Sequence, residues 1–215
     1  MPIADPRWKT RVAGDGEMLV AGPGLFIGYL NKPEETLEAL RDGWLHTGDV
    51  VQLRPDGLLA IIDRKKEIIN TSGGKSISPA QIENELRQSP YISEAAVCGD
   101  GRKYLVALIE VDHIATADWA KDRGEAINTY SDFCSSEAVI RLIEGEVAKA
   151  NQRLAPVEQI KSFRILPEEL TAENGVMTAT RKKKRKVLNE RYKDLIDSLY
   201  DHSEDSLIRS ALSNT

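Results

Sequence analysis

Two extended segments joined by a turn constrain the fold of this chain more than any other feature. Residues 49–53 and 58–63 are rich in strand-forming side chains, and Pro55-Asp56-Gly57 lies between them. Because proline fixes φ and glycine accepts positive φ, the triplet predicts the turn of a β-hairpin. Asp49 would begin this hairpin and Arg64 would end it. A carboxylate and a guanidinium in these places suit a ligand with both a diol and an anion, as a nucleotide has.

Periodicity along the rest of the chain indicates a mixed α+β fold. Val139, Ile143 and Val147 recur at helical spacing, so residues 137–154 predict a long helix with Ser136 as its cap. We expect an α+β small domain preceded by a β-rich remnant of a larger domain. Further helices are expected at 33–40, 78–88, 113–123 and near the end, where Leu188, Tyr192, Leu195 and Leu199 share one face, and further strands at 17–21, 95–98, 104–111 and 160–166.

Composition excludes several classes of protein. A formal net charge of −5 argues against a dedicated nucleic-acid binder. Cys98 and Cys134 are too few and too far apart for a disulfide framework or a zinc site, so no metal site is expected. No apolar run approaches the roughly 20 residues that span a bilayer, and the first residues lack the order of a signal peptide. We therefore expect a cytoplasmic protein, with which peripheral membrane contact is compatible.

Five segments, in their order and spacing, resemble the carboxyl-terminal part of one enzyme superfamily, the adenylate-forming acyl-CoA synthetases. This superfamily also includes luciferases and peptide-synthetase adenylation domains. The agreement continues to about residue 200, and the long stretch between residues 111 and 160 is similar to that of long-chain fatty-acid–CoA ligases, which short-chain relatives lack. The five segments are residues 16–20, 28–36, 43–49, 62–69 and 72–83.

The resemblance implies a role for five residues. Asp49 would bind the ribose hydroxyls of ATP or of the acyl-adenylate, and Arg64 would reach the same ribose or the α-phosphate. Lys66 would be the hinge about which the small domain rotates between two half-reactions. Gly73 and Gly74 would border the passage for the pantetheine arm of CoA, because small residues let a ligand approach the backbone.

Without the resemblance, each of these residues has a simpler interpretation. Asp49 would belong to a turn before a strand, and Arg64 would make a surface salt bridge. Lys65-Lys66 would be a solvated run of charge. The two glycines, Gly73 and Gly74, would only make a turn before the helix at residues 78–88.

A basic segment near the end supplies the candidate catalytic residue. Residues 173–185 are similar to the terminal motif of long-chain fatty-acyl-CoA synthetases, in which a lysine follows a threonine-rich loop. By position this is Lys182, whose ammonium would contact the carboxylate substrate and the α-phosphate during adenylation. The family usually has apolar neighbours there, but this chain has Arg181 and Lys183, so the register within residues 181–186 stays open by one position. The alternatives are a nucleic-acid or targeting patch, or contact with an anionic membrane surface.

Two family motifs are missing from the sequence. It contains neither the phosphate loop nor the aromatic-Gly-x-Thr-Glu segment that supports adenine and magnesium. The resemblance therefore implies the last third of a long-chain fatty-acid–CoA ligase, whose substrates are a fatty acid, ATP and CoA. The Mg²⁺ of such an enzyme would be held mainly by the missing amino-terminal part. We expect this chain not to complete catalysis alone.

The expected organisation has four parts. Residues 1–63 would be the end of the large AMP-binding domain, residues 64–66 the hinge, residues 67–200 the small mobile domain, and residues 201–215 a polar tail. The first part should expose apolar surface where the large domain packs. The rival interpretation is a non-catalytic binding module, or a subunit of a split synthetase that pairs with a separate amino-terminal half.

Overall fold

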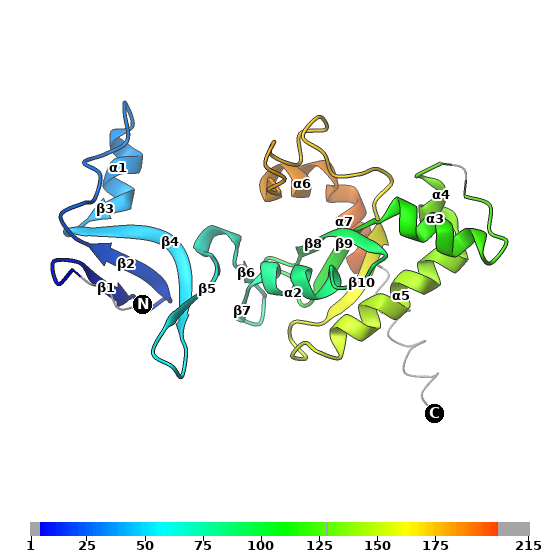
Figure 1. The fold of residues 1–215 in the computed structure, drawn as a ribbon, viewed down its shortest axis with the longest axis horizontal. Coiled ribbons are helices and arrows are strands. Elements are labelled where there is room, and N and C mark those ends of the chain that lie inside the picture. Colours follow the sequence, from blue (N-terminus) through cyan, green and yellow to red (C-terminus); the bar gives the residue numbers. More distant parts are fainter. Residues whose placement is uncertain (1–4, 128, 202–215) are drawn as a thin grey trace. The chain divides into compact units, whose positions relative to one another are not determined.

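The computed structural model describes residues 5–127 and 129–201 and divides the chain into two compact units, residues 1–68 and residues 69–215. Both units contain helices and strands (Figure 1), which confirms the predicted α+β class. Of the predicted polar tail, residues 202–215 lie outside the described part of the chain. No helix among the described residues has the length and apolar character needed to cross a membrane.

The first unit is built on an antiparallel sheet. The predicted hairpin is confirmed, because β4 pairs with β5 and places Asp49 opposite Arg64. The strand order is β1-β2-β4-β3, and β5 pairs with a different stretch of β4. The elements are β1 (Lys9–Val12), β2 (Glu17–Ala21), α1 (Pro33–Ala39), β3 (Leu40–Arg41), β4 (Trp44–Leu53), β5 (Leu59–Arg64) and the short 3₁₀ helix η1 (Lys65–Glu67).

The segment between the predicted helix at 33–40 and the predicted strand at 49–53 contains a further hairpin. Helix α1 ends at Ala39, and Asp42-Gly43 connects β3 to β4. Asp42 and Gly43 have φ angles of 52° and 78°, which are typical of the tight hairpin turns whose twist matches that of paired strands. Strand β4 consequently begins at Trp44 rather than at Asp49.

The first unit has little core. Among its described residues, Leu19 and Val51 are the buried large apolar side chains. Ile27 is 99% exposed and Leu30 is 88% exposed, so the expectation of exposed apolar surface is confirmed. The other exposed large apolar side chains of this unit are Val12, Phe26, Tyr29, Leu37, Leu53, Leu58, Leu59 and Ile61.

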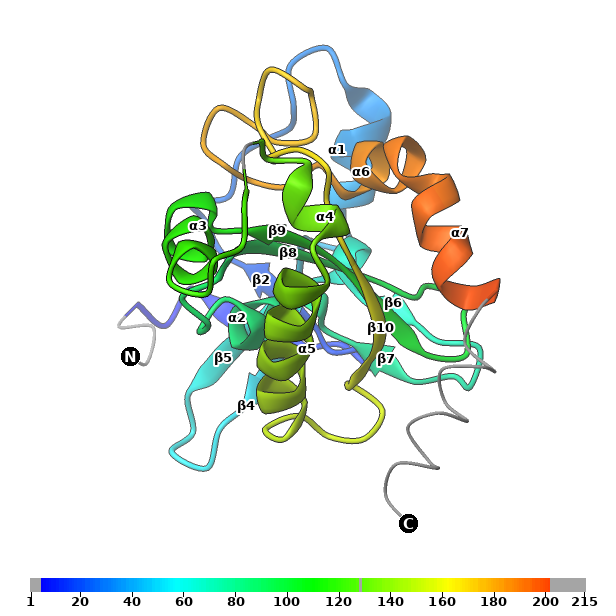
Figure 2. The same ribbon diagram turned by 90° about the vertical axis from the view of Figure 1, so that its right-hand side faces the viewer.

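The second unit has a three-stranded sheet in the order β10-β9-β8, with β9 antiparallel to β8 and parallel to β10. A small hairpin of β6 and β7 precedes it. Figure 2 shows β10 between α5 and α7. The elements are β6 (Ile69–Asn70), β7 (Ser76–Ile77), α2 (Pro79–Leu86), β8 (Ile92–Cys98), β9 (Leu105–Val111), α3 (His113–Lys121), α4 (Asp132–Ser135), α5 (Glu137–Asn151), β10 (Ile160–Ile165), α6 (Arg185–Arg191) and α7 (Lys193–Asp201).

The sheet of the second unit is buried on both faces. On β9, Leu105 and Ala107 pack in the apolar cluster that includes α2 and α5 residues, whereas Val106 and Leu108 pack in the cluster that includes α6 and α7 residues. Successive strand residues point to opposite faces, so a strand covered on both sides is a continuous apolar run. This pattern explains why β8 and β9 are almost uninterrupted in apolar character.

Two helices of this unit differ from their predictions. The predicted final helix is two helices, α6 and α7, separated at Tyr192, whose φ of −105° and ψ of 22° are not helical. The Tyr192 hydroxyl donates to Glu168 Oε1 at 2.9 Å. Because Glu168 lies outside the predicted helix, helical spacing does not predict this contact. Helix α4 was not predicted, whereas α5 and its cap are confirmed, with Val139 N donating to Ser136 Oγ.

Candidate functional site

Asp49 and Arg64, which the sequence places at the two ends of one hairpin, meet in the structure. Arg64 Nη1 donates to Asp49 Oδ1 at 2.9 Å. The side chains are 21% exposed for Asp49 and 55% exposed for Arg64. The simpler interpretation of Arg64, a surface salt bridge, is therefore also what the structure contains. A guanidinium has five N–H donors, so one bond to Asp49 leaves donors that an anionic ligand can use.

A buried carboxylate that the sequence interpretation missed organises the backbone beside Asp49. Glu17, on β2, is only 3% exposed. Its Oε1 accepts from Gly48 N at 2.9 Å, and its Oε2 accepts from Lys65 Nζ at 3.0 Å and lies 3.2 Å from His46 Nδ1. Burial alone would raise the pKa of Glu17, but these hydrogen bonds outweigh burial and lower it. Glu17 is therefore held as a carboxylate.

Strand β4 is irregular at Gly48. The pairing of β2 with β4 shifts register between Glu17 and Leu19, and Gly48 has a φ of +69°, which glycine adopts without strain. Thr47 Oγ1 donates to Met18 O at 2.7 Å and accepts from Asp49 N at 3.1 Å. These bonds fix the backbone on both sides of Gly48, so the direction of Asp49 is set by β2.

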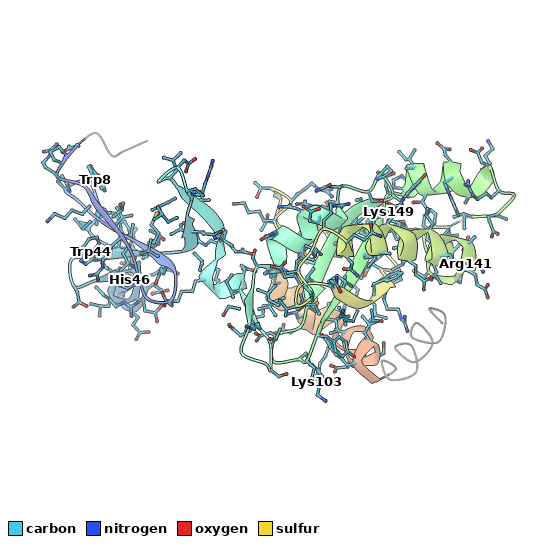
Figure 3. All side chains as sticks on the ribbon, turned by 90° about the horizontal axis from the view of Figure 1, so that it is seen from below. Trp8, Trp44, His46, Lys103, Arg141 and Lys149 are labelled. Atoms are coloured by element: carbon cyan, nitrogen blue, oxygen red, sulfur yellow. The ribbon has the colours of Figure 1, made fainter. Side chains whose placement is uncertain are left out.

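A pocket of about 580 Å³ opens beside the irregular stretch of β4 at Gly48. His46, which lines it, and Trp44 are labelled close together on the first unit in Figure 3. Arg11 stacks on the Trp44 ring at 4.5 Å from the ring centroid. Four cationic and three acidic side chains line the pocket, and three of the cations, Lys32, Arg64 and Lys65, form ion pairs with carboxylates. The lining residues are Glu17, Tyr29, Lys32, Glu35, Glu38, Ala39, Arg41, His46, Thr47, Gly48, Arg64 and Lys65.

The two lysines after Arg64 have different environments. Lys65 Nζ lies 2.6 Å from Asp15 Oδ2 and 3.0 Å from Glu17 Oε2. The hydrogen bonds to Asp15 and Glu17 raise the pKa of Lys65. Lys66, the predicted hinge residue, is exposed within η1. The run is therefore not uniformly solvated, because its first lysine is bound to the sheet.

Gly73 and Gly74 lie in the exposed turn between β6 and β7. Thr71 N donates to Lys75 O, and Gly74 N donates to Thr71 O at 2.9 Å. Gly74 has a φ of +74°, and a Cβ there would meet no atom within 4 Å. The structure thus contains the plain turn of the simpler interpretation, and its open surface has room for a ligand against the backbone.

The basic run of residues 181–186 is divided into inward and outward side chains. Lys183 Nζ lies 2.8 Å from Glu83 Oε2 and 2.7 Å from Glu94 Oε1, and its side chain is 12% exposed. Arg185 Nη1 lies 2.8 Å from Glu83 Oε1. Glu83 on α2 and Glu94 on β8 are 2% and 6% exposed. Sequence interpretation missed both acids. Glu94 lies within the mostly apolar strand β8, which is a signal that could have found it, whereas Glu83 has the polar neighbours Gln81, Asn84 and Glu85 and gives no such signal.

Lys182 is exposed on a closed loop. Thr178 N donates to Lys182 O at 2.8 Å, and Lys182 N donates to Thr178 Oγ1 at 3.0 Å. Arg181, at the tip, has a φ of +56°. Backbone hydrogen bonding between Thr178 and Lys182 therefore closes the loop, and the ion pairs of Lys183 and Arg185 hold the residues that follow it.

The candidate residues divide between the two units. Asp49, Arg64 and Lys66 belong to the first unit, and Gly73, Gly74 and Lys182 belong to the second. Within residues 5–127 and 129–201, no group of three or more His, Cys, Asp or Glu side chains is placed to hold a metal ion.

Comparison with known proteins gives consistent matches. Residues 66–204 match the family model described as AMP-binding enzyme C-terminal domain. The chain is 40% identical over 197 residues to the long-chain-fatty-acid–CoA ligase FadD15 of Mycobacterium tuberculosis, covering 91% of this chain and 33% of that protein. It is 37% identical over 191 residues to human long-chain-fatty-acid–CoA ligase 1, covering 87% of this chain and 27% of that protein. The chain thus spans about a third of the length of the curated relatives it matches.

Solved structures share the fold. The adenylation domain of the carboxylate reductase from Mycobacterium chelonae superposes with a TM-score of 0.74 at 24% identity, covering 90% of this chain and 31% of that one. The A domain of the carboxylic acid reductase from Segniliparus rugosus, in complex with AMP and a co-purified carboxylic acid, gives a TM-score of 0.72 at 24% identity, covering 93% and 29%.

Proposed function

The chain belongs to the family of AMP-binding enzyme C-terminal domains, and from this premise we propose that it is the carboxyl-terminal portion of a long-chain fatty-acid–CoA ligase. The parent reaction has two steps. An oxygen of the fatty carboxylate attacks the α-phosphorus of ATP, which forms the acyl-adenylate and releases pyrophosphate. The sulfur of CoA then attacks the acyl carbonyl, which forms the thioester and releases AMP.

In this proposal Asp49 and Arg64 hold the nucleotide. Asp49 accepts hydrogen bonds from the ribose hydroxyls, and Arg64 donates to the same ribose or to the α-phosphate. Charged hydrogen bonds are about twice as strong as neutral ones. The 2.9 Å contact between the two side chains supports the proposal, because it places a carboxylate and a guanidinium side by side on paired strands.

Lys182 is the catalytic residue of the proposed adenylation step. The observation that carries this assignment is the division of the basic run: Lys183 is bound to two buried carboxylates, whereas Lys182, the residue before it, is exposed. Two unit charges about 4 Å apart interact by roughly 4 kcal/mol at an effective dielectric near 20. An ammonium at that distance from the developing charge on the α-phosphate would therefore accelerate the step by orders of magnitude.

The remaining assignments concern movement and the second substrate. We assign the pivot to Lys66, within the hinge at residues 64–66, between a part of the large domain at residues 1–63 and a mobile small domain at residues 67–200. Gly73 and Gly74 border the proposed CoA passage, for which their exposed turn leaves room. We assign the Mg²⁺ of the parent ligase mainly to its amino-terminal part.

A chimera tests this function directly. In it, the present chain replaces the matching third of the ligase FadD15, which is 40% identical to it. We expect the chimera to form acyl-CoA from a long-chain fatty acid, ATP and CoA, whereas the 215-residue chain alone should not complete the reaction. A folded chimera without activity would contradict the proposal, and robust ATP–pyrophosphate exchange by the chain alone would contradict its incompleteness.

The second candidate function is a subunit or binding module that pairs with a separate amino-terminal half. The exposed apolar side chains of the first unit, Ile27 and Leu30 above all, favour it. Co-purification with such a half would support a split enzyme. A stable monomer that binds neither AMP nor CoA would instead support a non-catalytic module.

A further inference from the structure

Three elements of the first unit converge on one carboxylate. Glu17 lies on β2, Gly48 lies on β4 directly before Asp49, and Lys65 lies in η1 directly after Arg64. Glu17 accepts from Gly48 N through Oε1 and from Lys65 Nζ through Oε2. The same rigid, planar group therefore binds the neighbour of each proposed nucleotide ligand.

The environment of Glu17 makes this link stiff. The side chain is 4% exposed, whereas the Lys65 side chain is 45% exposed and reaches the carboxylate from the surface. Hydrogen bonds to a buried charged acceptor are stronger than those between neutral groups, and they cannot be exchanged for water without cost. A displacement of Lys65 consequently acts on Glu17, and a displacement of Glu17 acts on the Gly48 amide.

Lys65 also marks where flexible backbone can begin. It is bound by Asp15 and Glu17, and the exposed Lys66 follows it. Along the chain, a change of backbone dihedrals at Lys66 therefore reaches β5 through Lys65, which is fixed to β2 and to the turn before it. The loop beside Asp49 is fixed to the same carboxylate.

We propose that Glu17 is a positioning residue that couples the segment 46–49 to the hinge at 64–66, so that the nucleotide-binding loop and the pivot respond to each other. This inference rests on the proposed function, since the coupled segments are those that carry the proposed nucleotide ligands Asp49 and Arg64. The coupling itself is a property of the first unit and can be measured without nucleotide.

The test is amide hydrogen exchange on the full 215-residue chain, with Glu17→Gln, Lys65→Gln and the double variant. Glu17→Gln should accelerate exchange of the Gly48 amide and of residues 65–67 by about tenfold. Lys65→Gln, a change at a half-exposed side chain that leaves the sheet intact, should accelerate the Gly48 amide by at least about threefold, since it removes a bond to a charged group. In the Glu17→Gln background, Lys65→Gln should add nothing.

Two controls separate coupling from loss of structure. Glu35→Gln removes an exposed carboxylate of the same pocket that pairs with Lys32, and exchange at Gly48 should be unchanged. Amides of Leu45 and Val50 should also be unchanged in every variant, whereas a merely structural role of Glu17 would accelerate them together with Gly48.

The outcomes are distinguishable. If Lys65→Gln leaves the Gly48 amide unchanged, or if its effect persists without Glu17, the inference is overturned. Titration of the FadD15 chimera and of its Asp49→Asn variant with AMP then tests the proposed function separately. Coupled exchange in the chain, together with a chimera whose AMP affinity is unchanged by Asp49→Asn, would overturn the nucleotide assignment and leave the coupling intact.

Discussion

At the residue scale, buried acids decide which bases of the run at residues 181–186 are available for chemistry. Glu83 and Glu94 bind Lys183, and Glu83 also binds Arg185. The sequence shows six adjacent cations, from which a surface patch for nucleic acid is a reasonable interpretation. In the structure, two of these cations, Lys183 and Arg185, form internal ion pairs. Such pairs are not visible in local sequence, because their partners lie about a hundred residues away.

Lys183→Met should destabilise the second unit, because it leaves two buried carboxylates without their shared cation. Breaking a buried ion pair by removing one partner costs about 3–5 kcal/mol. The measurement is urea unfolding in a Trp8→Phe/Trp44→Phe background, followed by the fluorescence of Trp119 in the second unit. The matched control is the exposed Lys186→Met, which should stay within about 0.5 kcal/mol of wild type. Equal stability of both variants would contradict the ion-pair account.

The cluster of Asp15, Glu17 and Lys65 predicts acid sensitivity of the first unit. Hydrogen bonding to Lys65 lowers the pKa of Asp15, and for Glu17 the hydrogen bonds from Lys65, Gly48 and His46 outweigh burial and also lower the pKa. A lowered folded-state pKa contributes stability above the unfolded value, near 4, which is lost as the pH falls through the folded value. Unfolding of the first unit, followed by the fluorescence of Trp8 and Trp44 in a Trp119→Phe background, should become easier below about pH 4.

Glu17→Gln should flatten that acid dependence, because glutamine does not titrate. Acid sensitivity as steep in the variant as in the wild type would show that other groups control it. Lys65 has the opposite effect at high pH. Its raised folded-state pKa contributes stability below the unfolded-state pKa, near 10, and this stability is lost as the pH rises through the folded-state pKa.

At the element scale, sequence pattern was informative where a segment makes its own structure. The hairpin of β4 and β5, the long helix α5 and its cap follow from turn chemistry and helical spacing. Pattern failed where a distant contact intervenes. The hairpin of β3 and β4 was not predicted, because the two-residue strand β3 is too short to give a sequence pattern of its own. The predicted final helix is interrupted at Tyr192, whose hydroxyl donates to Glu168, a residue outside the predicted helix.

Ser136→Ala should weaken α5. The Ser136 hydroxyl accepts from Val139 N at 3.3 Å, and loss of an N-cap side chain costs about 1 kcal/mol. Ser135→Ala is the matched control, because this exposed neighbour donates to Asp132 O and does not cap α5. Chemical unfolding of both variants measures the difference, and a Ser135 effect as large as that of Ser136 would contradict the capping role.

At the scale of the whole molecule, the two units differ in how much apolar surface they bury. The second unit has two apolar clusters over a sheet covered on both faces, whereas Leu19 and Val51 are the buried large apolar side chains in the described part of the first. Hydrophobic burial is the dominant favourable contribution to folding. The first unit is therefore expected to be the less stable of the two.

Unfolding of the whole chain should consequently show two transitions. Trp8 and Trp44 report on the first unit, and Trp119 reports on the second. In urea, the fluorescence of a Trp119→Phe variant should change at a lower denaturant concentration than that of a Trp8→Phe/Trp44→Phe variant. Coincident transitions by both reporters would instead show that the two units unfold as one.

Family membership also belongs to this scale. The match at residues 66–204 establishes the family that the ordered motifs indicated. Each motif alone is ambiguous, but their order and spacing along the chain are specific to the family. The buried acids Glu17, Glu83 and Glu94 were not predicted, since only the fold shows which carboxylates lie beside which cations.

The central claim is that Lys182 acts in adenylation and not in thioester formation. In the chimera with FadD15, Lys182→Ala should lower fatty-acid-dependent ATP–pyrophosphate exchange by about 10²–10³-fold, while conversion of a supplied acyl-adenylate to acyl-CoA stays within about threefold of wild type. Lys184→Ala, at an exposed cation of the same run, should change neither rate. Undiminished exchange without Lys182 would contradict the account.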